Sequence, residues 1–247
     1  MLSLLLPLSL AHAEEPVWTA LVDDPPGEMW NDGLVHRPAV VGGFAAMTGT
    51  TVVGPVNPTF GQLDLGGGFG IVDSPIVLGV TGQIVGAQLP TWDGPIVAAQ
   101  SLGAEAWVSL RWKRWDHAVS FGGSSALSDG SWYLRHPNEA GTRYVGRYVA
   151  RMDGDRTDVN LEARMGLGEA VPAEFATSAA VITEVRPWLA LSAGAEIGLV
   201  PYGLAMVGAH VRPVDHLELG ATLGVPFPLF SVGALEMQPA LAAKAWF

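Results

Sequence analysis

The chain contains no cysteine, few charged residues and, in particular, few basic ones. Without cysteine it forms no disulfide bond and has no thiolate for catalysis or metal binding. Charged residues make up 15% of the chain and apolar residues 49%, whereas about a quarter of a typical soluble domain is charged. Lys and Arg number 13 against 24 Asp and Glu, which gives a net charge of −11. This charge argues against nucleic acid as a partner, because phosphate backbones attract basic surfaces.

A long apolar run is also missing. A membrane-spanning helix needs about 20 mainly apolar residues, and the longest uncharged stretch, between Arg37 and Asp64, is interrupted throughout by Gly, Thr and Pro. A chain this apolar needs another way to cover its surface. Alternating strands in a closed barrel are the other structure that lipid permits, because closure satisfies every backbone donor and acceptor.

Apolar and polar residues alternate with period two along much of the chain, as they do in strands with two different faces. In residues 157–168 one face is Val159, Leu161, Ala163, Met165 and Leu167, and the other is Asp158, Asn160, Glu162, Arg164 and Gly166. The pattern predicts strands near 38–48, 60–72, 75–88, 101–113, 117–127, 143–152, 157–168, 174–186, 188–199, 203–212, 216–225 and 233–247. A soluble lipocalin-like barrel or sandwich is the alternative, but it would have too few charges for its surface.

The stretch 233–247 alternates in the same way and stops on an aromatic residue. Every second residue back from Phe247 is apolar, while the intervening positions include Glu236 and Lys244. This stretch resembles the closing strand of bacterial outer-membrane β-barrels. The resemblance implies an all-β chain in one transmembrane antiparallel up-and-down β-barrel of about 12 strands, placed in the cell outer membrane. It further implies contact with outer-membrane lipid and with the barrel-assembly machinery through the closing strand.

The N-terminal residues predict secretion. Leu2 to Leu10 form a short apolar run, and Ala11-His12-Ala13 precedes an acidic start at Glu14. We expect a signal peptide at 1–13, an acidic periplasmic segment or short plug at 14–37, and the barrel at 38–247. The alternative for the first segment is an apolar strand or helix.

Short and long connections alternate between the expected strands. Short turns fall near 73–75, 114–116, 153–156, 186–187 and 212–215, and other connections at 49–59, 89–100, 128–142, 169–173, 200–202 and 226–232. Short periplasmic turns and longer outside loops are typical of outer-membrane barrels. An interfacial aromatic girdle is expected at the short-turn end from Trp112, Trp115, Trp188, Trp246 and Phe247. In the longest outside loop, candidates for ligand contact are Trp132, Tyr133, Arg135 and His136.

Charged side chains on the polar face are the candidates for lining the barrel interior. The spacing places Arg143, Arg147 and Arg151 on one face, and a turn at 153–156 predicts that Arg151 faces Asp158 and Arg147 faces Glu162. Arg143 and Arg164 then lack opposite partners and are candidates for a solute-facing positive spot. The arginines either guide anionic solutes or form a paired structural network. Further candidates are Glu105, Arg111, Glu184, Glu196, His210, Glu218, Glu236 and Lys244.

The sequence shows no catalytic, cofactor-binding or metal-binding motif. The six histidines are scattered, no metal-ligand spacing appears, and Gly66 to Gly70 lacks the Lys-Ser/Thr of a phosphate-binding loop. The leading hypothesis is a passive pore for small hydrophilic solutes, without a cofactor. A sealed barrel with a structural or surface-binding role is the alternative, and an outer-membrane enzyme is third.

Cleavage of the signal peptide is directly testable. We expect the mature protein purified from outer membranes to begin at Glu14, because the small residues Ala11 and Ala13 frame a cleavage site. Intact-mass measurement checks this, and Ala13→Arg should block processing. A mature chain that retains Leu2 to Leu10 would contradict the prediction.

Overall fold

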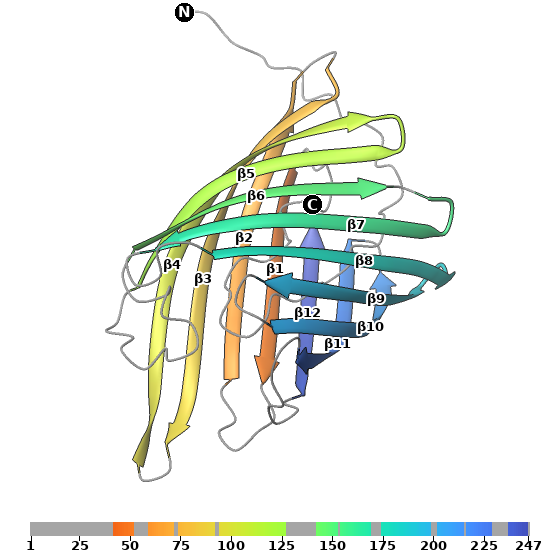
Figure 1. Cartoon of the computed structure of the whole chain (residues 1–247). Helices are drawn as coiled ribbons and strands as arrows, with labels where there is room; N and C mark the ends of the chain where they lie inside the picture. The colour runs from red at the N-terminus through yellow and green to blue at the C-terminus, as the bar shows by residue number, and fades with distance from the viewer. Residues whose placement is uncertain are drawn as a thin grey trace, which may run out of the picture.

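The chain forms a closed antiparallel β-barrel, seen in a computed structural model (Figure 1). The structure describes residues 42–51, 59–71, 74–91, 94–126, 142–152, 154–168, 174–198, 202–214, 216–228 and 237–246. The strands are β1 (Gly42–Thr51), β2 (Thr59–Gly70), β3 (Ile76–Thr91), β4 (Gly94–Trp112), β5 (Trp115–Ala126), β6 (Thr142–Met152), β7 (Thr157–Gly168), β8 (Glu174–Arg186), β9 (Leu189–Gly198), β10 (Tyr202–Val214), β11 (Leu217–Pro228) and β12 (Gln238–Trp246). The expected all-β, twelve-stranded barrel is confirmed. The described residues include no helix with the length and apolarity to cross a membrane.

The barrel closes where β1 pairs with β12. The pairing runs from Phe44 opposite Trp246 to Thr50 opposite Ala240. Each other strand pairs with its neighbours in sequence, so the sheet has no free edge. The expected pairing of the closing strand with the first strand is therefore confirmed, and its register is now defined.

The barrel is apolar on the outside and polar on the inside. Every strand carries at least one large exposed apolar or aromatic side chain, such as Val80 on β3, Phe121 on β5 and Leu241 on β12, exposed by 63%, 63% and 69%. The alternate positions are buried and hold most of the charges. This is the reverse of a soluble protein, where exposed apolar patches are small, and it confirms the two faces predicted from the alternation.

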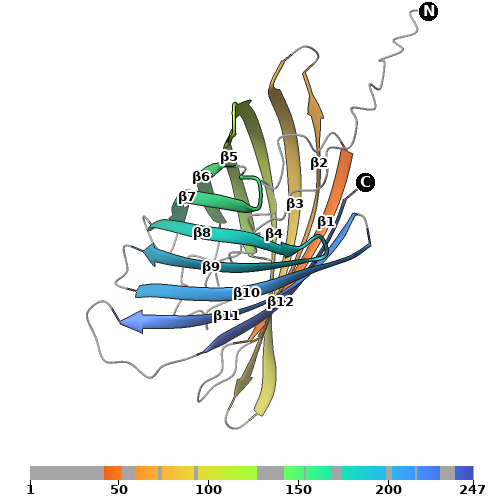
Figure 2. The same cartoon turned by 90° about the vertical axis from the view of Figure 1, so that its right-hand side faces the viewer.

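One expected connection is wrong. Residues 89–100 were expected to form a loop, but β3 continues to Thr91 and β4 begins at Gly94. The two strands form a long hairpin that reaches past its neighbours at one end of the barrel (Figures 1 and 2). The ladder of backbone pairs continues from Gln88 opposite Ala98 to Thr91 opposite Gly94. Backbone hydrogen bonds do not depend on the alternation of apolar and polar side chains, so pairing extends beyond that alternation.

The opposite end of the barrel carries the tight turns, and we call it the turn end. Lys113 and His216 adopt left-handed φ angles of 60° and 69° there, which reverses the chain within very few residues. Trp112 and Trp188 are exposed by 62% and 57% at this end, as the predicted girdle requires, and Trp115 is half-buried. The side chain of Trp246 and residue Phe247 lie outside the described part.

An indole ring inside the barrel depends on a glycine opposite it. Trp107 on β4 is 5% exposed and lies directly opposite Gly79 on β3. A β-carbon at position 79 would lie only 2.0 Å from the Trp107 ring. The absence of a side chain at Gly79 therefore lets the ring lie flat against the wall. Trp107 packs there in a buried apolar cluster with Val77, Ala118 and Val149.

We predict that Gly79→Ala destabilises the barrel by about 1–3 kcal/mol, because the indole has to leave its position. Gly86→Ala on the same strand is the matched control, since a β-carbon there meets nothing within 4 Å. Urea unfolding in detergent, followed by tryptophan fluorescence, measures both variants. Equal effects of the two substitutions would contradict this account of Gly79.

Candidate functional site: the charged barrel interior

Charged side chains from strands all round the barrel meet in its interior. In the described part, the buried carboxylates are Asp64, Glu105, Asp116, Asp158, Glu162, Glu196 and Glu218, and the buried basic residues are Arg147, Arg151, Arg164 and Lys244, together with His210. Among the described side chains, seven buried carboxylates therefore stand against four Lys and Arg. Most of the residues expected on the inner face are in this set.

The remaining candidates are either less buried or not described. Glu184 is half-buried on the inner face of β8. The side chains of Arg111 and Arg143 lie outside the described part, and so does Glu236. The loop candidates Trp132, Tyr133, Arg135 and His136 also lie outside it.

The predicted register of the β6–β7 hairpin is wrong by two residues. Arg147 lies opposite Arg164, and Arg151 lies opposite Asn160, rather than opposite Glu162 and Asp158. The turn is longer than assumed: the last pair is Met152 with Val159. A slip of two residues keeps every side chain on its face, so the inside and outside assignment is unaffected.

The two predicted ion pairs nevertheless form, along diagonals. Arg151 Nη2 donates to Asp158 Oδ2 over 2.6 Å, and Arg147 Nε lies 3.2 Å from Glu162 Oε1. Asp158 also accepts a hydrogen bond from the backbone of Gly154, so it ties the turn to the ion pair. Long side chains reach diagonal partners on an adjacent strand easily.

Arg164 was expected to lack an opposite partner and to belong to a solute-facing positive spot, but it is buried and paired with a carboxylate from outside the hairpin. Its Nη2 donates to Glu196 Oε1 on β9 over 2.8 Å, with both side chains at most 4% exposed. The pair crosses β8, where the small, buried Ala176 stands opposite Arg164. Two arginines face each other directly at 147 and 164, and each turns to a different carboxylate, which relieves their repulsion.

A second polar group connects β9, β10 and β11. His210 Nε2 lies 2.9 Å from Ser192 Oγ, and His210 Nδ1 lies 3.3 Å from Glu218 Oε1. Arg212 Nη2 lies 3.8 Å from the other oxygen of Glu218. The alternation predicted that His210 and Glu218 face inward, but it gave no signal for Ser192 as a site residue. The signal that it lacked was the pairing of three strands, which brings these positions together.

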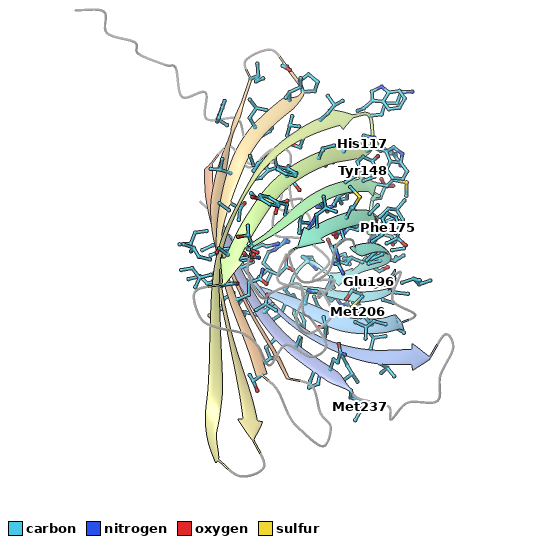
Figure 3. All side chains as sticks on the ribbon, turned by 60° about the vertical axis from the view of Figure 1, so that its left-hand side comes forward. His117, Tyr148, Phe175, Glu196, Met206 and Met237 are labelled. Carbon is cyan, nitrogen blue, oxygen red and sulfur yellow. The ribbon has the colours of Figure 1, made fainter. Side chains whose placement is uncertain are left out.

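The interior next to Ser192 is apolar. Ile182 on β8 lies directly opposite Ser192. It belongs to a buried cluster with Ala180, Ala190, Leu204 and Met206. Glu196 and Met206 are labelled on the neighbouring strands β9 and β10 in Figure 3. The interior thus has an apolar cluster on β8 to β10 beside the polar contacts of Ser192 and His210.

The outer wall carries a polar pair, His117 and Tyr148, among its apolar residues. His117 Nδ1 lies 2.9 Å from the hydroxyl of Tyr148 (Figure 3). The imidazole stacks between Trp115 and Tyr148, with both ring centroids 6.1 Å away. The Tyr148 hydroxyl thus gives the polar His117 ring a hydrogen-bond partner on an apolar face, close to the turn end. In the described part, no group of three or more His, Cys, Asp or Glu residues is arranged to hold a metal ion.

No family model and no curated protein matches the chain. Among solved structures, an outer-membrane channel from Pseudomonas putida F1 is similar with a TM-score of 0.66 and 10% identity, covering 91% of this chain and 100% of that one. A KdgM porin in complex with disordered oligogalacturonate gives 0.55 and 10%, covering 82% and 99%. Outer membrane phospholipase A from Escherichia coli gives 0.51 and 12%, covering 82% and 89%.

These similarities show that the chain has the fold of bacterial outer-membrane β-barrels. The resemblance first drawn from the closing strand is thereby confirmed. Channels predominate among these neighbours, but one enzyme shares the fold. Function therefore has to be argued from the interior residues.

We predict that Arg164→Met costs about 3–5 kcal/mol of barrel stability, because it leaves Glu196 buried without its cation. Adding Glu196→Gln should restore most of the loss. Arg114→Met is the control, since its 3.9 Å pair with Asp155 is exposed on both sides and should matter little. Unfolding in lipid vesicles measures the wild type, Arg164→Met, Glu196→Gln, the double variant and Arg114→Met, and additive losses in the double variant would contradict the coupling.

Proposed function

We propose that this protein is an outer-membrane channel of narrow bore that passes small hydrophilic solutes, with cations favoured over anions. The observation that carries the proposal is the inside-out distribution of polarity, with an apolar outer wall and a charged interior. Charged groups are costly in a sealed apolar interior, while a hydrated passage accommodates them. The similarity of fold to outer-membrane channels supports this function.

The ion pairs determine the expected width. Arg151, Glu196 and Glu218 are no more than 2% exposed, so these charges are covered by neighbouring side chains. A passage has to run beside them. Twelve strands lie between the eight-stranded barrels that side chains fill and the larger porins, which agrees with a small unitary conductance.

The same burial favours a second candidate, a sealed barrel with a structural or surface-binding role. Arginine–carboxylate hydrogen bonds join β6 to β7 and β7 to β9, and they stabilise the barrel wall without a solute.

Under either function, we place the turn end in the periplasm and the long β3–β4 hairpin outside, as short turns and long loops are arranged in outer-membrane barrels.

We predict small, cation-selective currents in planar bilayers, because buried carboxylates outnumber buried Lys and Arg residues in the described interior. Glu105→Gln, inside β4, should lower the cation preference measured from reversal potentials in a salt gradient. Asp155→Asn is the matched control, since its side chain is 95% exposed in a turn.

The controls separate the two candidates. The protein should show the faster gel migration of a folded barrel before boiling, so that folded material is known to be present. Repeated insertions of folded protein without current would contradict the channel and favour the sealed barrel. Currents that prefer anions would contradict the selectivity.

A further inference from the structure

Ser192, His210 and Glu218 form a chain of contacts that has the order of a serine hydrolase triad. His210 presents Nε2 to Ser192 Oγ at 2.9 Å and Nδ1 to Glu218 Oε1 at 3.3 Å. His210 is hydrogen-bonded to the Ser192 hydroxyl through Nε2 and has the Glu218 carboxylate beside Nδ1, which is the order of groups that activates serine as a nucleophile. The three residues lie on adjacent strands, so the rigid sheet fixes their positions.

The surroundings of these residues match their roles. The side chains of His210 and Glu218 are at most 1% exposed, while Ser192 is half-buried. Arg212 Nη2 also lies 3.8 Å from Glu218 Oε2, so Glu218 contacts a cation as well as His210. His210 Nδ1 makes no hydrogen bond within the described part. Its approach to Glu218 is therefore an electrostatic contact and not a hydrogen bond.

A glycine leaves room for the serine. Gly208 on β10 stands directly opposite Ser192 on β9 and Thr222 on β11. A β-carbon at position 208 would lie 2.6 Å from Ser192 Oγ and 2.7 Å from Thr222 Cγ2. Ser192 Oγ therefore occupies space that any other residue at 208 would fill. This makes Gly208 a positioning residue for the contact between Ser192 and His210.

We propose that Ser192 is an activated nucleophile inside the barrel and that it hydrolyses carboxylic esters with a small apolar acyl group. His210 is the general base, and Glu218 positions and supports it. The acyl group is accommodated by the apolar cluster beside Ser192, which includes Ile182 and Met206. The proposal stands independently of conduction, since it needs only entry of the ester into the interior.

The reaction balances in two steps. Ser192 Oγ bonds the acyl carbon, its proton passes to His210 Nε2, and the ester C–O bond breaks as the alcohol leaves with that proton. Water then attacks the acyl-serine, giving its proton to Nε2. The Ser192–acyl bond breaks, Ser192 recovers the proton, and the carboxylic acid is released. No oxidant, metal or cofactor takes part in either step.

The test is covalent labelling of the folded barrel with diisopropyl fluorophosphate, located by peptide mass spectrometry. The phosphorus should bond to Ser192 Oγ as fluoride leaves, and p-nitrophenyl butyrate should be hydrolysed. Ser192→Ala should abolish both signals. Ser109→Ala removes another buried, inward serine and should change neither.

Two positioning variants test the mechanism rather than the presence of serine. Gly208→Ala and Glu218→Gln should each slow labelling by at least about tenfold, and Glu218→Asp should recover part of the rate. Gly61→Ala, where a β-carbon meets nothing within 4 Å, is the control for the glycine. Unboiled gel migration confirms that each barrel is folded.

The outcomes are decisive in both directions. Selective labelling of Ser192 that depends on Gly208 and Glu218 supports the proposal. A folded wild-type barrel that neither labels at Ser192 nor turns over the ester overturns it. Labelling that proceeds at the same rate in folded Gly208→Ala and Glu218→Gln barrels overturns the roles of His210 and Glu218.

Discussion

The hydrogen-bonded seam between β1 and β12 is the constraint on which the rest of this barrel depends. A chain whose strands are apolar on one face has to leave no backbone edge exposed to lipid, and the seam removes the last edge. Closure then forces every alternate side chain into a shared interior. The charges of β2 to β12 are brought together by that topology, not by any local preference of the strands.

The interior resolves the cost of burying charge by pairing it across strands. Arg151 with Asp158 joins neighbours, whereas Arg164 with Glu196 passes over an intervening strand. Each pair offsets part of the desolvation of its members. Near Ser192 an apolar cluster lies beside the polar contacts with His210. Two chemical environments thus share one barrel interior.

The alternation of residues predicted which faces the side chains occupy, because period two is a property of each strand alone. It predicted the β6–β7 ion pairs although the assumed register was wrong by two residues. The pairs still form because the long arginine side chains reach carboxylates at diagonal positions. It failed where information from several strands is needed. The partner of Arg164 lies two strands away, and Ser192 gains its contact with His210 only through pairing of β9 with β10. The length of the β3–β4 hairpin was missed because backbone pairing continues beyond the strand pattern.

The direct opposition of Arg147 and Arg164 has an evolutionary consequence. Two like charges at one level of the barrel are tolerable only while both of their carboxylates, Glu162 and Glu196, are present. These four positions on three strands are therefore expected to change together in evolution. Substitutions on the outer wall can accumulate singly among apolar residues, but inside the barrel a lasting change at any of the four requires a compensating change at another.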